Sequence, residues 1–313
     1  MKRRQHSVVL VFSAAMAIAA PALAQTKAAA DPHADHAMEM QAAAPATVAP
    51  RNPNLPPSGD LPGDKDAEVK KQLASSPRKS EWVSIKANGP TPLKSYIVYP
   101  ERKDKAPVVI VVMEIFGLTD WIRGVADQLA KEGFIAIAPD FLSGMGPNGT
   151  GSAELGEDGA RGVIGKVTDE DKVRILNDVR AYALAMPAAN GKVGVVGFCW
   201  GGGTAFLYAR KQPALNAAVS YYGPMPADAA EFATTKAPVL GLYGGNDARV
   251  DANIDKAKEG MATAGATYDP HIFDGAGHGF LRQQNGTGQG AGNMKAAEQA
   301  WPLTVEWLKK NTK

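Results

Sequence analysis

Residues 193–203 read Val-Gly-Val-Val-Gly-Phe-Cys-Trp-Gly-Gly-Gly, an apolar run that passes directly into a glycine cluster around Cys199. The run from Val193 to Val196 is apolar at successive positions, which is typical of a central strand covered by helices on both faces. A helical pattern follows over about 202–211. The stretch therefore predicts a strand, a tight turn that carries Cys199 and then a helix, as in α/β proteins with a parallel sheet.

The same alternation of short apolar runs and longer helical patterns continues on both sides of this stretch. It predicts an α/β fold, with a mostly parallel central sheet and helices on both faces. The segments around Trp82 and from Lys94 to Tyr99 alternate apolar and polar residues, so we expect an antiparallel hairpin at one edge of the sheet. The predicted strands cover 82–87, 93–99, 107–113, 134–138, 193–197, 216–221, 238–243 and 267–273. The predicted helices cover 120–132, 169–186, 202–211, 253–264 and 294–310.

Two local expectations concern the segment between the fourth strand and the next long helix. Residues 141–165 are rich in glycine and show no clear periodicity, which predicts a long loop and a candidate active-site lid. Asp169 stands where the following helical pattern begins, so we expect its side chain to cap that helix.

Cys199 is the one cysteine among 313 residues, so it cannot form an internal disulfide. Gly197 and Gly201 flank it as in the G-x-S-x-G nucleophile turn, with Cys in place of Ser. A nucleophile on such a turn needs small neighbours, and the N-terminus of the following helix favours a thiolate. The alternative is a buried structural Cys in a phosphate-binding junction. The absence of the P-loop lysine and of a G-x-G-x-x-G motif argues against that alternative.

A base for this thiol can be sought among only five histidines. Two of them, His271 and His278, fall in the globular part. His271 lies within a predicted strand, whereas His278 lies in a glycine-flanked loop beyond it, so His278 is the better candidate. The orienting acid is expected between nucleophile and histidine in the chain. Asp247, which follows a predicted strand, is preferred to Asp251 and Asp274.

Glu114 is a further candidate because it follows the apolar strand Val108–Met113. A carboxylate at the carboxyl end of a buried strand is costly without a partner, and ligand crevices of open α/β sheets lie at this edge.

The N-terminal part of the chain predicts export. Residues 1–24 combine Lys2-Arg3-Arg4, an apolar run and a small-residue pattern at Ala24, as in a secretory signal peptide that is cleaved after Ala24. The protein is therefore expected to be periplasmic or secreted, without stable membrane insertion after cleavage. Residues 25–63 predict a flexible tail, followed by a domain over 64–313. Removal of the signal peptide would remove Lys2, Arg3 and Arg4, so the formal charge of +2 would become −1. A chain this close to neutral lacks the excess positive charge of a nucleic-acid-binding protein.

Four short motifs in order, Glu114-Ile-Phe-Gly117, Gly197-Phe-Cys-Trp-Gly-Gly202, Asp247 and Gly277-His-Gly-Phe280, resemble the dienelactone hydrolase (carboxymethylenebutenolidase-like) family. The resemblance runs from about Trp82 to Leu308 and implies an α/β-hydrolase fold. The implied site is a triad of Cys199, His278 and Asp247, with Glu114 controlling the charge of the thiol, an oxyanion hole from the backbone of Ile115 and Trp200, and substrate contacts from Arg282 and Tyr222.

Two positions depart from the family pattern. Gly279 stands where the family has Ser after the catalytic histidine, and a second carboxylate-binding arginine aligns with neither Arg161 nor Arg174. These departures put a narrow preference for dienelactone in doubt and leave a broader esterase or lactonase open.

The resulting hypothesis is a hydrolase that cleaves a small-molecule lactone or carboxylic ester through a thioester at Cys199, with no metal or organic cofactor. The alternative is an exported metal-binding or interaction protein on an inactive hydrolase scaffold, because His33, His36, Met38 and Met40 cluster in the tail. A redox role for the thiol is weaker, since no resolving cysteine exists.

Overall fold

The computed structural model describes residues 61–313 apart from 65, 90 and 286–289, so the predicted signal peptide and residues 25–60 of the predicted tail lie outside the described residues. The described part contains one eight-stranded sheet with the order β1-β2-β4-β3-β5-β6-β7-β8. Its strands are β1 (Ser80–Ile85), β2 (Leu93–Val98), β3 (Ala106–Val112), β4 (Ile135–Pro139), β5 (Ala189–Phe198), β6 (Ala217–Tyr221), β7 (Val239–Gly244) and β8 (Tyr268–Phe273).

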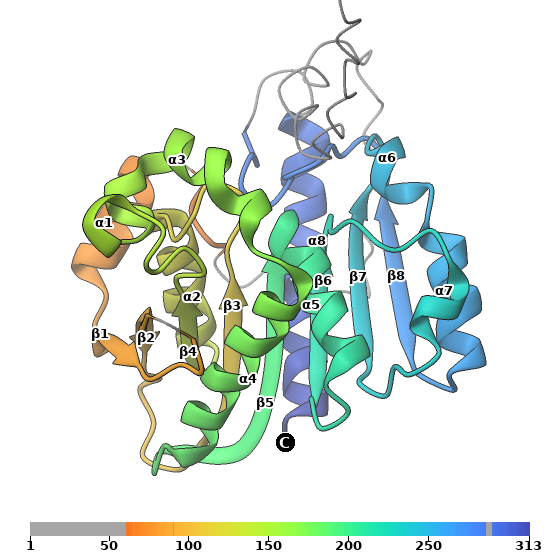
Figure 1. The fold of residues 1–313 in the computed structure, drawn as a ribbon. Coiled ribbons are helices and arrows are strands. Elements are labelled where there is room, and N and C mark those ends of the chain that lie inside the picture. The colour runs from red at the N-terminus through yellow and green to blue at the C-terminus, as the bar shows by residue number, and fades with distance from the viewer. Residues whose placement is uncertain (1–60, 65, 90, 286–289) are drawn as a thin grey trace, which may run out of the picture. The chain divides into compact units, whose positions relative to one another are not determined.

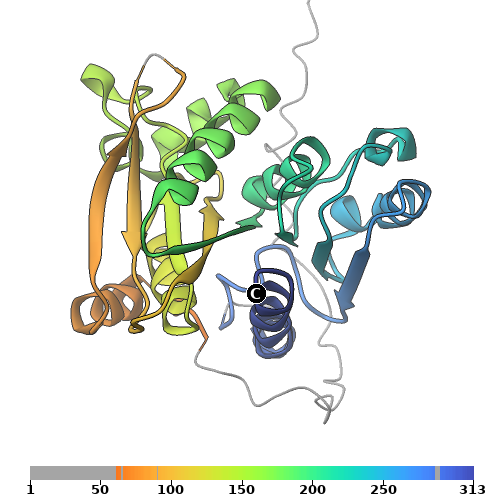
Figure 2. The same ribbon diagram turned by 90° about the horizontal axis from the view of Figure 1, so that it is seen from below.

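Helices cover both faces of this sheet, which confirms the predicted fold class. Helices α4 and α5 lie on one face and α2 and α8 on the other, while the ends of the parallel strands point to the top of the view (Figures 1 and 2). The helices are α1 (Asp66–Ser75), α2 (Asp120–Lys131), α3 (Ser152–Val163), α4 (Asp169–Ala185), α5 (Trp200–Lys211), α6 (Ala248–Asp251), α7 (Ile254–Thr263) and α8 (Gly290–Asn311). None of those in the described part is long and apolar enough to cross a membrane.

The centre of the sheet is formed by the strands that carry the most continuous apolar runs. Strands β3 and β5 pair in parallel from Val108 and Val193 to Val112 and Gly197. The side chains from Val108 to Val112 have no solvent exposure. Buried on both faces, such strands gain stability from apolar area removed from water at about 25 cal/mol per Å². Their carboxyl ends, Met113 and Phe198, are thereby brought to one edge of the sheet.

The predicted hairpin at the edge is confirmed. Strand β1 pairs antiparallel with β2, and β2 pairs antiparallel with β4, so β2 is the strand that runs against the others. The side chains of β1 alternate in exposure, as expected for a strand with one solvated face. Trp82, on this strand, remains 45% exposed.

Residues 141–165 differ from the expected loop because they contain helix α3 and two short 3₁₀ turns, Pro147–Gly149 and Ile164–Lys166. Local propensity does not predict α3, since its sequence contains three glycines. Tertiary hydrogen bonds hold it instead: the buried Asp140 accepts from the Ser152 amide at 2.8 Å and from the Ser152 hydroxyl at 2.5 Å. The residues of α3 alone therefore do not predict this helix, because it depends on hydrogen bonds to a residue outside it.

The cap of α4 also differs from the prediction. Thr168, and not Asp169, is the residue that caps α4, and its hydroxyl accepts from the Asp171 amide at 3.2 Å. Asp169 occupies the first helical position, where it pairs with Lys172 at 2.8 Å.

Substituting Asp140→Ala is expected to lower the free energy of unfolding by about 2–4 kcal/mol, because it leaves the buried Ser152 donors without an acceptor. Urea unfolding followed by circular dichroism measures this change. Asp158→Ala removes an exposed acid of the same helix and serves as the control. Equal urea midpoints for the two variants would contradict the role given to Asp140.

Candidate active site

Cys199 occupies a sharp turn between β5 and α5. Its φ of 55° and ψ of −119° are strained for a residue with a side chain, and its side chain is 4% exposed. Backbone segments pack closely against each other at this turn. A Cβ on Gly197 would lie under 3.0 Å from the Gly201 carbonyl oxygen, and a Cβ on Gly201 would also lie under 3.0 Å from the Met113 carbonyl oxygen. Glycines are therefore required on both sides of the thiol, as the sequence pattern predicts.

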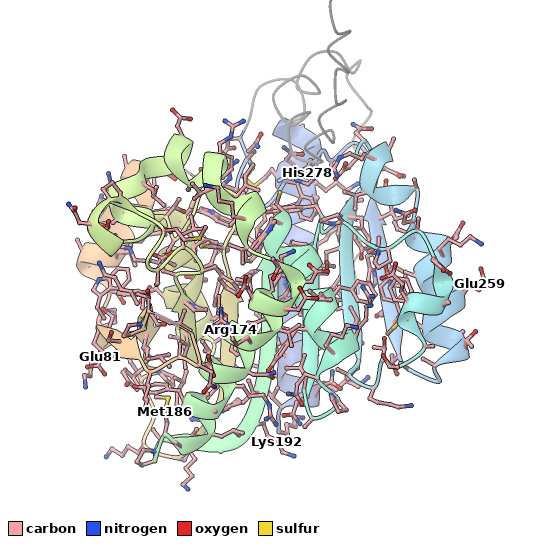
Figure 3. All side chains as sticks on the ribbon, in the orientation of Figure 1. Glu81, Arg174, Met186, Lys192, Glu259 and His278 are labelled. Carbon is pink, nitrogen blue, oxygen red and sulfur yellow. The ribbon has the colours of Figure 1, made fainter. Side chains whose placement is uncertain are left out.

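The loop after β8 brings His278 to this turn, and Figure 3 shows His278 at the end of the molecule where the parallel strands finish. Its Nδ1 lies 2.5 Å from Oδ2 of Asp247, which follows β7. Cys199 lies close enough to the imidazole to act on its pKa. Burial lowers the pKa of His278, but the hydrogen bond to Asp247, the interaction with Cys199 and the charges of both groups outweigh it and raise this pKa to about 10.

The structure separates the rival candidates for acid and base. Asp247 is the carboxylate placed against His278, with its side chain 1% exposed. Asp251 lies one turn further along α6, and burial together with the charge of Asp247 raises its pKa to about 6. His271 remains in β8, as expected, where its Nε2 lies 3.2 Å from Asp269.

Glu114 is buried at the end of β3 and pairs with Arg282. The Arg282 Nε lies 2.7 Å from the Glu114 carboxylate, and the charge of Glu114, although opposed by burial, raises the pKa of Arg282. The guanidinium also lies 4.6 Å from the centre of the Phe116 ring. Arg161 of α3 lies 5.8 Å from the same ring. Of the two arginines that the sequence leaves unassigned, Arg161 is therefore the one on Phe116, whereas Arg174 pairs with Asp171.

Tyr222 forms a wall of the site behind the histidine. It is fully buried, has a positive φ of 38°, and its ring centre lies 5.1 Å from that of His278. Burial and the charge of Glu114 raise the pKa of Tyr222 well above its ordinary value. Its hydroxyl is buried without a hydrogen-bond partner among the described residues, so it is a donor available to a ligand.

The residues expected to form the oxyanion hole lie in the two chain segments that meet near Gly201. Trp200 is the first residue of α5, where an amide has no acceptor within the helix. Its ring packs on Phe141 at 5.4 Å, which fixes the start of the helix. Ile115 follows Glu114, and the close approach of Met113 to Gly201 brings that segment against the turn. Two amide-bearing segments thus converge next to Cys199.

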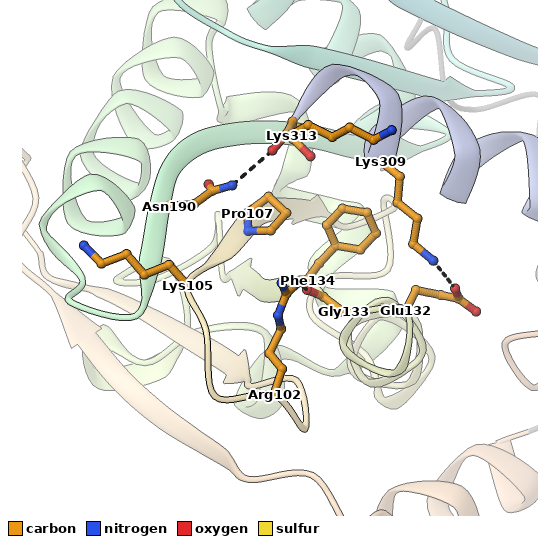
Figure 4. Close-up of a pocket in the computed structure, with 10 residues that line it drawn as sticks. Arg102, Lys105, Pro107, Glu132, Gly133, Phe134, Asn190, Lys309 and Lys313 are labelled. Atoms are coloured by element: carbon orange, nitrogen blue, oxygen red, sulfur yellow. Dashed lines mark hydrogen bonds and ion pairs between the residues drawn. The ribbon is translucent and has the colours of Figure 1, made fainter.

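A pocket of about 400 Å³ lies at the other end of the sheet (Figure 4). It is formed around Phe134 and Pro107, at the amino ends of β4 and β3. Its cation Lys309 pairs with Glu132 at 2.8 Å. Cys199, His278 and Asp247 do not line it, because they follow the carboxyl ends of the strands. The described residues contain no group of three or more His, Cys, Asp or Glu side chains able to hold a metal ion.

Comparison with known proteins agrees with this geometry. The family model described as "Dienelactone hydrolase family" matches residues 93–312. The chain belongs to the dienelactone hydrolase family. A relative from Escherichia coli strain K12, named "Putative carboxymethylenebutenolidase", is 32% identical over 73% of this chain and 86% of its own length. A relative of the same name from Methylorubrum extorquens is 32% identical over 69% of this chain and 76% of its own.

The fold of a solved family structure is also similar. The Klebsiella pneumoniae protein titled "Putative Dienelactone Hydrolase" superimposes with a TM-score of 0.63 and 27% identity, covering 74% of this chain and 99% of its own. These similarities make the protein a hydrolase of the dienelactone hydrolase family, as the four sequence motifs predict.

Substituting Asp247→Asn is expected to lower the pKa of His278 by at least one unit, because the negative partner of the imidazolium is lost while the side-chain shape is kept. Titration of the histidine ring nitrogens by NMR measures this value. Asp269→Asn removes the corresponding partner of His271 and should leave His278 unchanged. A His278 pKa that stays near 10 in Asp247→Asn would show that another group holds the proton.

The raised pKa of Asp251 predicts a pH-dependent stability. The folded state prefers the protonated carboxyl, so stability is full below about pH 4 and is lost as the pH rises towards 6. Asp251→Asn should therefore raise the free energy of unfolding at pH 8 by about 1 kcal/mol, a value reduced by solvent screening, and change it little at pH 4. Asp255→Asn, at an exposed position of α7, is the control in urea unfolding at both pH values. A gain at pH 4 equal to that at pH 8 would refute the assignment.

Proposed function

We propose that this protein hydrolyses a carboxylic ester or lactone with Cys199 as the nucleophile and a thioester acyl-enzyme as the intermediate. The observation that carries the proposal is the position of His278 at the end of the sheet, where its Nδ1 lies 2.5 Å from Asp247 and its pKa is raised by the nearby Cys199. A nucleophile, a base and an orienting acid in this arrangement perform acyl transfer on several unrelated folds.

The electrostatics of the turn favour a reactive sulfur. The raised pKa of His278 keeps its imidazole protonated at neutral pH, and the amino end of α5 supplies a second positive field at Cys199. Both stabilise a negatively charged sulfur, which is the form of cysteine that attacks a carbonyl.

In the reaction, the sulfur adds to the substrate carbonyl, whose oxygen becomes negative opposite the Ile115 and Trp200 amides. The carbon–oxygen single bond breaks, and the leaving alkoxide takes the proton that His278 holds. The neutral imidazole then accepts a proton from water, and the resulting hydroxide attacks the thioester. Release of the carboxylic acid restores the sulfur and the imidazolium. No metal or organic cofactor takes part in these steps.

Three further residues bind the substrate or set the charge of the site, namely Arg282, Glu114 and Tyr222. Arg282 is a cation at the edge of the site, so it suits a negative or strongly polar substituent. Such a substituent competes with Glu114 for the guanidinium, and Glu114 released in this way would adjust the charge beside Cys199. The Tyr222 hydroxyl supplies a further hydrogen bond, because it has no partner among the described residues.

Replacing Cys199 tests the nucleophile directly. Cys199→Ala is expected to lower kcat for p-nitrophenyl acetate and a dienelactone by about 10³-fold or more, because the covalent route is lost. After rapid acid quench, the unaltered protein should carry the mass of one added acyl group and Cys199→Ala should not, which would place the thioester on the one cysteine of the chain. Turnover in Cys199→Ala equal to that of the unaltered protein would overturn the proposal.

A further inference from the structure

A second hollow adjoins the site on the side of the edge strand. Its volume is about 310 Å³, within the size of small-molecule pockets, and it lies between β1, the segment after β3, the start of α2 and α3. Its residues come from these four segments and are Trp82, Phe116, Leu118, Thr119, Asp120, Arg123, Ser152, Ala153, Gly156 and Glu157. We call this hollow the Trp82 groove.

The groove meets the catalytic residues at Phe116. The Phe116 side chain lines the groove, and the centre of its ring lies 4.6 Å from the guanidinium carbon of Arg282. Arg282 in turn pairs with Glu114. Glu157, at the rim of the groove, lies close enough to Arg282 to raise its pKa further, after the larger effect of Glu114. The groove and the site therefore share the Phe116 side chain and meet at its contact with Arg282.

The walls of the groove suit an uncharged aromatic group. Trp82, Phe116 and Leu118 supply apolar surface, and Trp82 is 45% exposed, so a ligand placed on it would remove much apolar area from water. Two of the three charged residues of the wall, Asp120 and Arg123, form an ion pair with each other. The third, Glu157, is exposed and repels an anion, so the wall suits an uncharged group better than an anionic one.

The order of the strands decides which part of the substrate reaches the groove. His278, which must deliver a proton to the leaving alkoxide, follows β8, while Phe116 follows β3 on the other side of β5. A carbonyl held at Cys199 with its leaving oxygen towards His278 directs its acyl part towards Phe116. The acyl part is also the part that remains on Cys199 in the thioester.

We infer that the Trp82 groove binds an aromatic group at the far end of the acyl chain, so that the substrates include aryl-substituted alkanoyl esters. This inference rests on the proposed function. It adds a preference for esters with a large aromatic acyl group. A site formed only by Cys199, Arg282 and Tyr222 would hydrolyse such esters and smaller ones equally well.

The test compares two esters with one leaving group, p-nitrophenyl acetate and p-nitrophenyl 3-phenylpropanoate. Trp82→Ala removes the aromatic wall, and Ala153→Phe fills the groove from the exposed side of α3. Each variant should lower kcat/KM for the phenylpropanoate about tenfold while changing that for the acetate less than twofold. Leu184→Ala, which truncates an exposed apolar side chain of α4, is the control for Trp82→Ala.

The outcomes separate the two proposals. If both variants keep the unaltered protein's ratio of kcat/KM for the phenylpropanoate to kcat/KM for the acetate, the groove inference is wrong. The assignment of Cys199 as the nucleophile is then unaffected. Turnover of both esters that persists in Cys199→Ala would overturn the proposed function and the groove inference with it. Since Ala153→Phe touches none of the contacts of Trp82 with Tyr96 and Lys94, a folding defect in Trp82→Ala leaves the second variant decisive.

Discussion

The close packing of backbone around Cys199 is the constraint on which the rest of the site depends. Gly201 touches the end of β3, and Gly202 touches the Tyr221 carbonyl at the end of β6, in both cases closer than a side chain would allow. The amide of Cys199 donates to that same carbonyl at 3.1 Å. These contacts fix the carboxyl ends of β3, β5 and β6 relative to one another. The surrounding backbone also maintains the positive φ of Cys199. A looser junction would relax the turn and withdraw the thiol from His278.

The charges at this edge follow from the same geometry. Two acids, Glu114 and Asp247, are buried within a few residues of strand ends, and each has a cationic partner, Arg282 or His278. A buried carboxylate without such a partner would be strongly destabilising. In the reaction that we propose, the same pairs supply a proton, through His278, and a cation for the substrate, through Arg282. Under that proposal, stability and reactivity depend on the same contacts.

The sequence predicts the sheet more fully than it predicts the surroundings of the site. All eight strands and the helices α2, α4, α5, α7 and α8 were expected, because apolar periodicity records burial directly. Cys199, His278 and Asp247 were expected to come together, because residues that follow parallel strands meet at one edge. Helix α3 was not expected, because its stability comes from Asp140, twelve residues earlier in the chain. The position of Arg161 on Phe116 was missed for the same reason, since it depends on α3.

This difference divides the molecule into two parts with separate tasks. The residues to which we assign the reaction follow β3, β5, β7 and β8, whose pairing fixes their positions within the sheet. The Trp82 groove is formed by the edge strand β1, the segment after β3, the start of α2 and a glycine-containing helix held by a few hydrogen bonds. Elements of this second kind tolerate substitution better, because fewer buried contacts depend on them. Changes in α3 would therefore alter which acyl groups fit while the contacts among Cys199, His278 and Asp247 stay as they are.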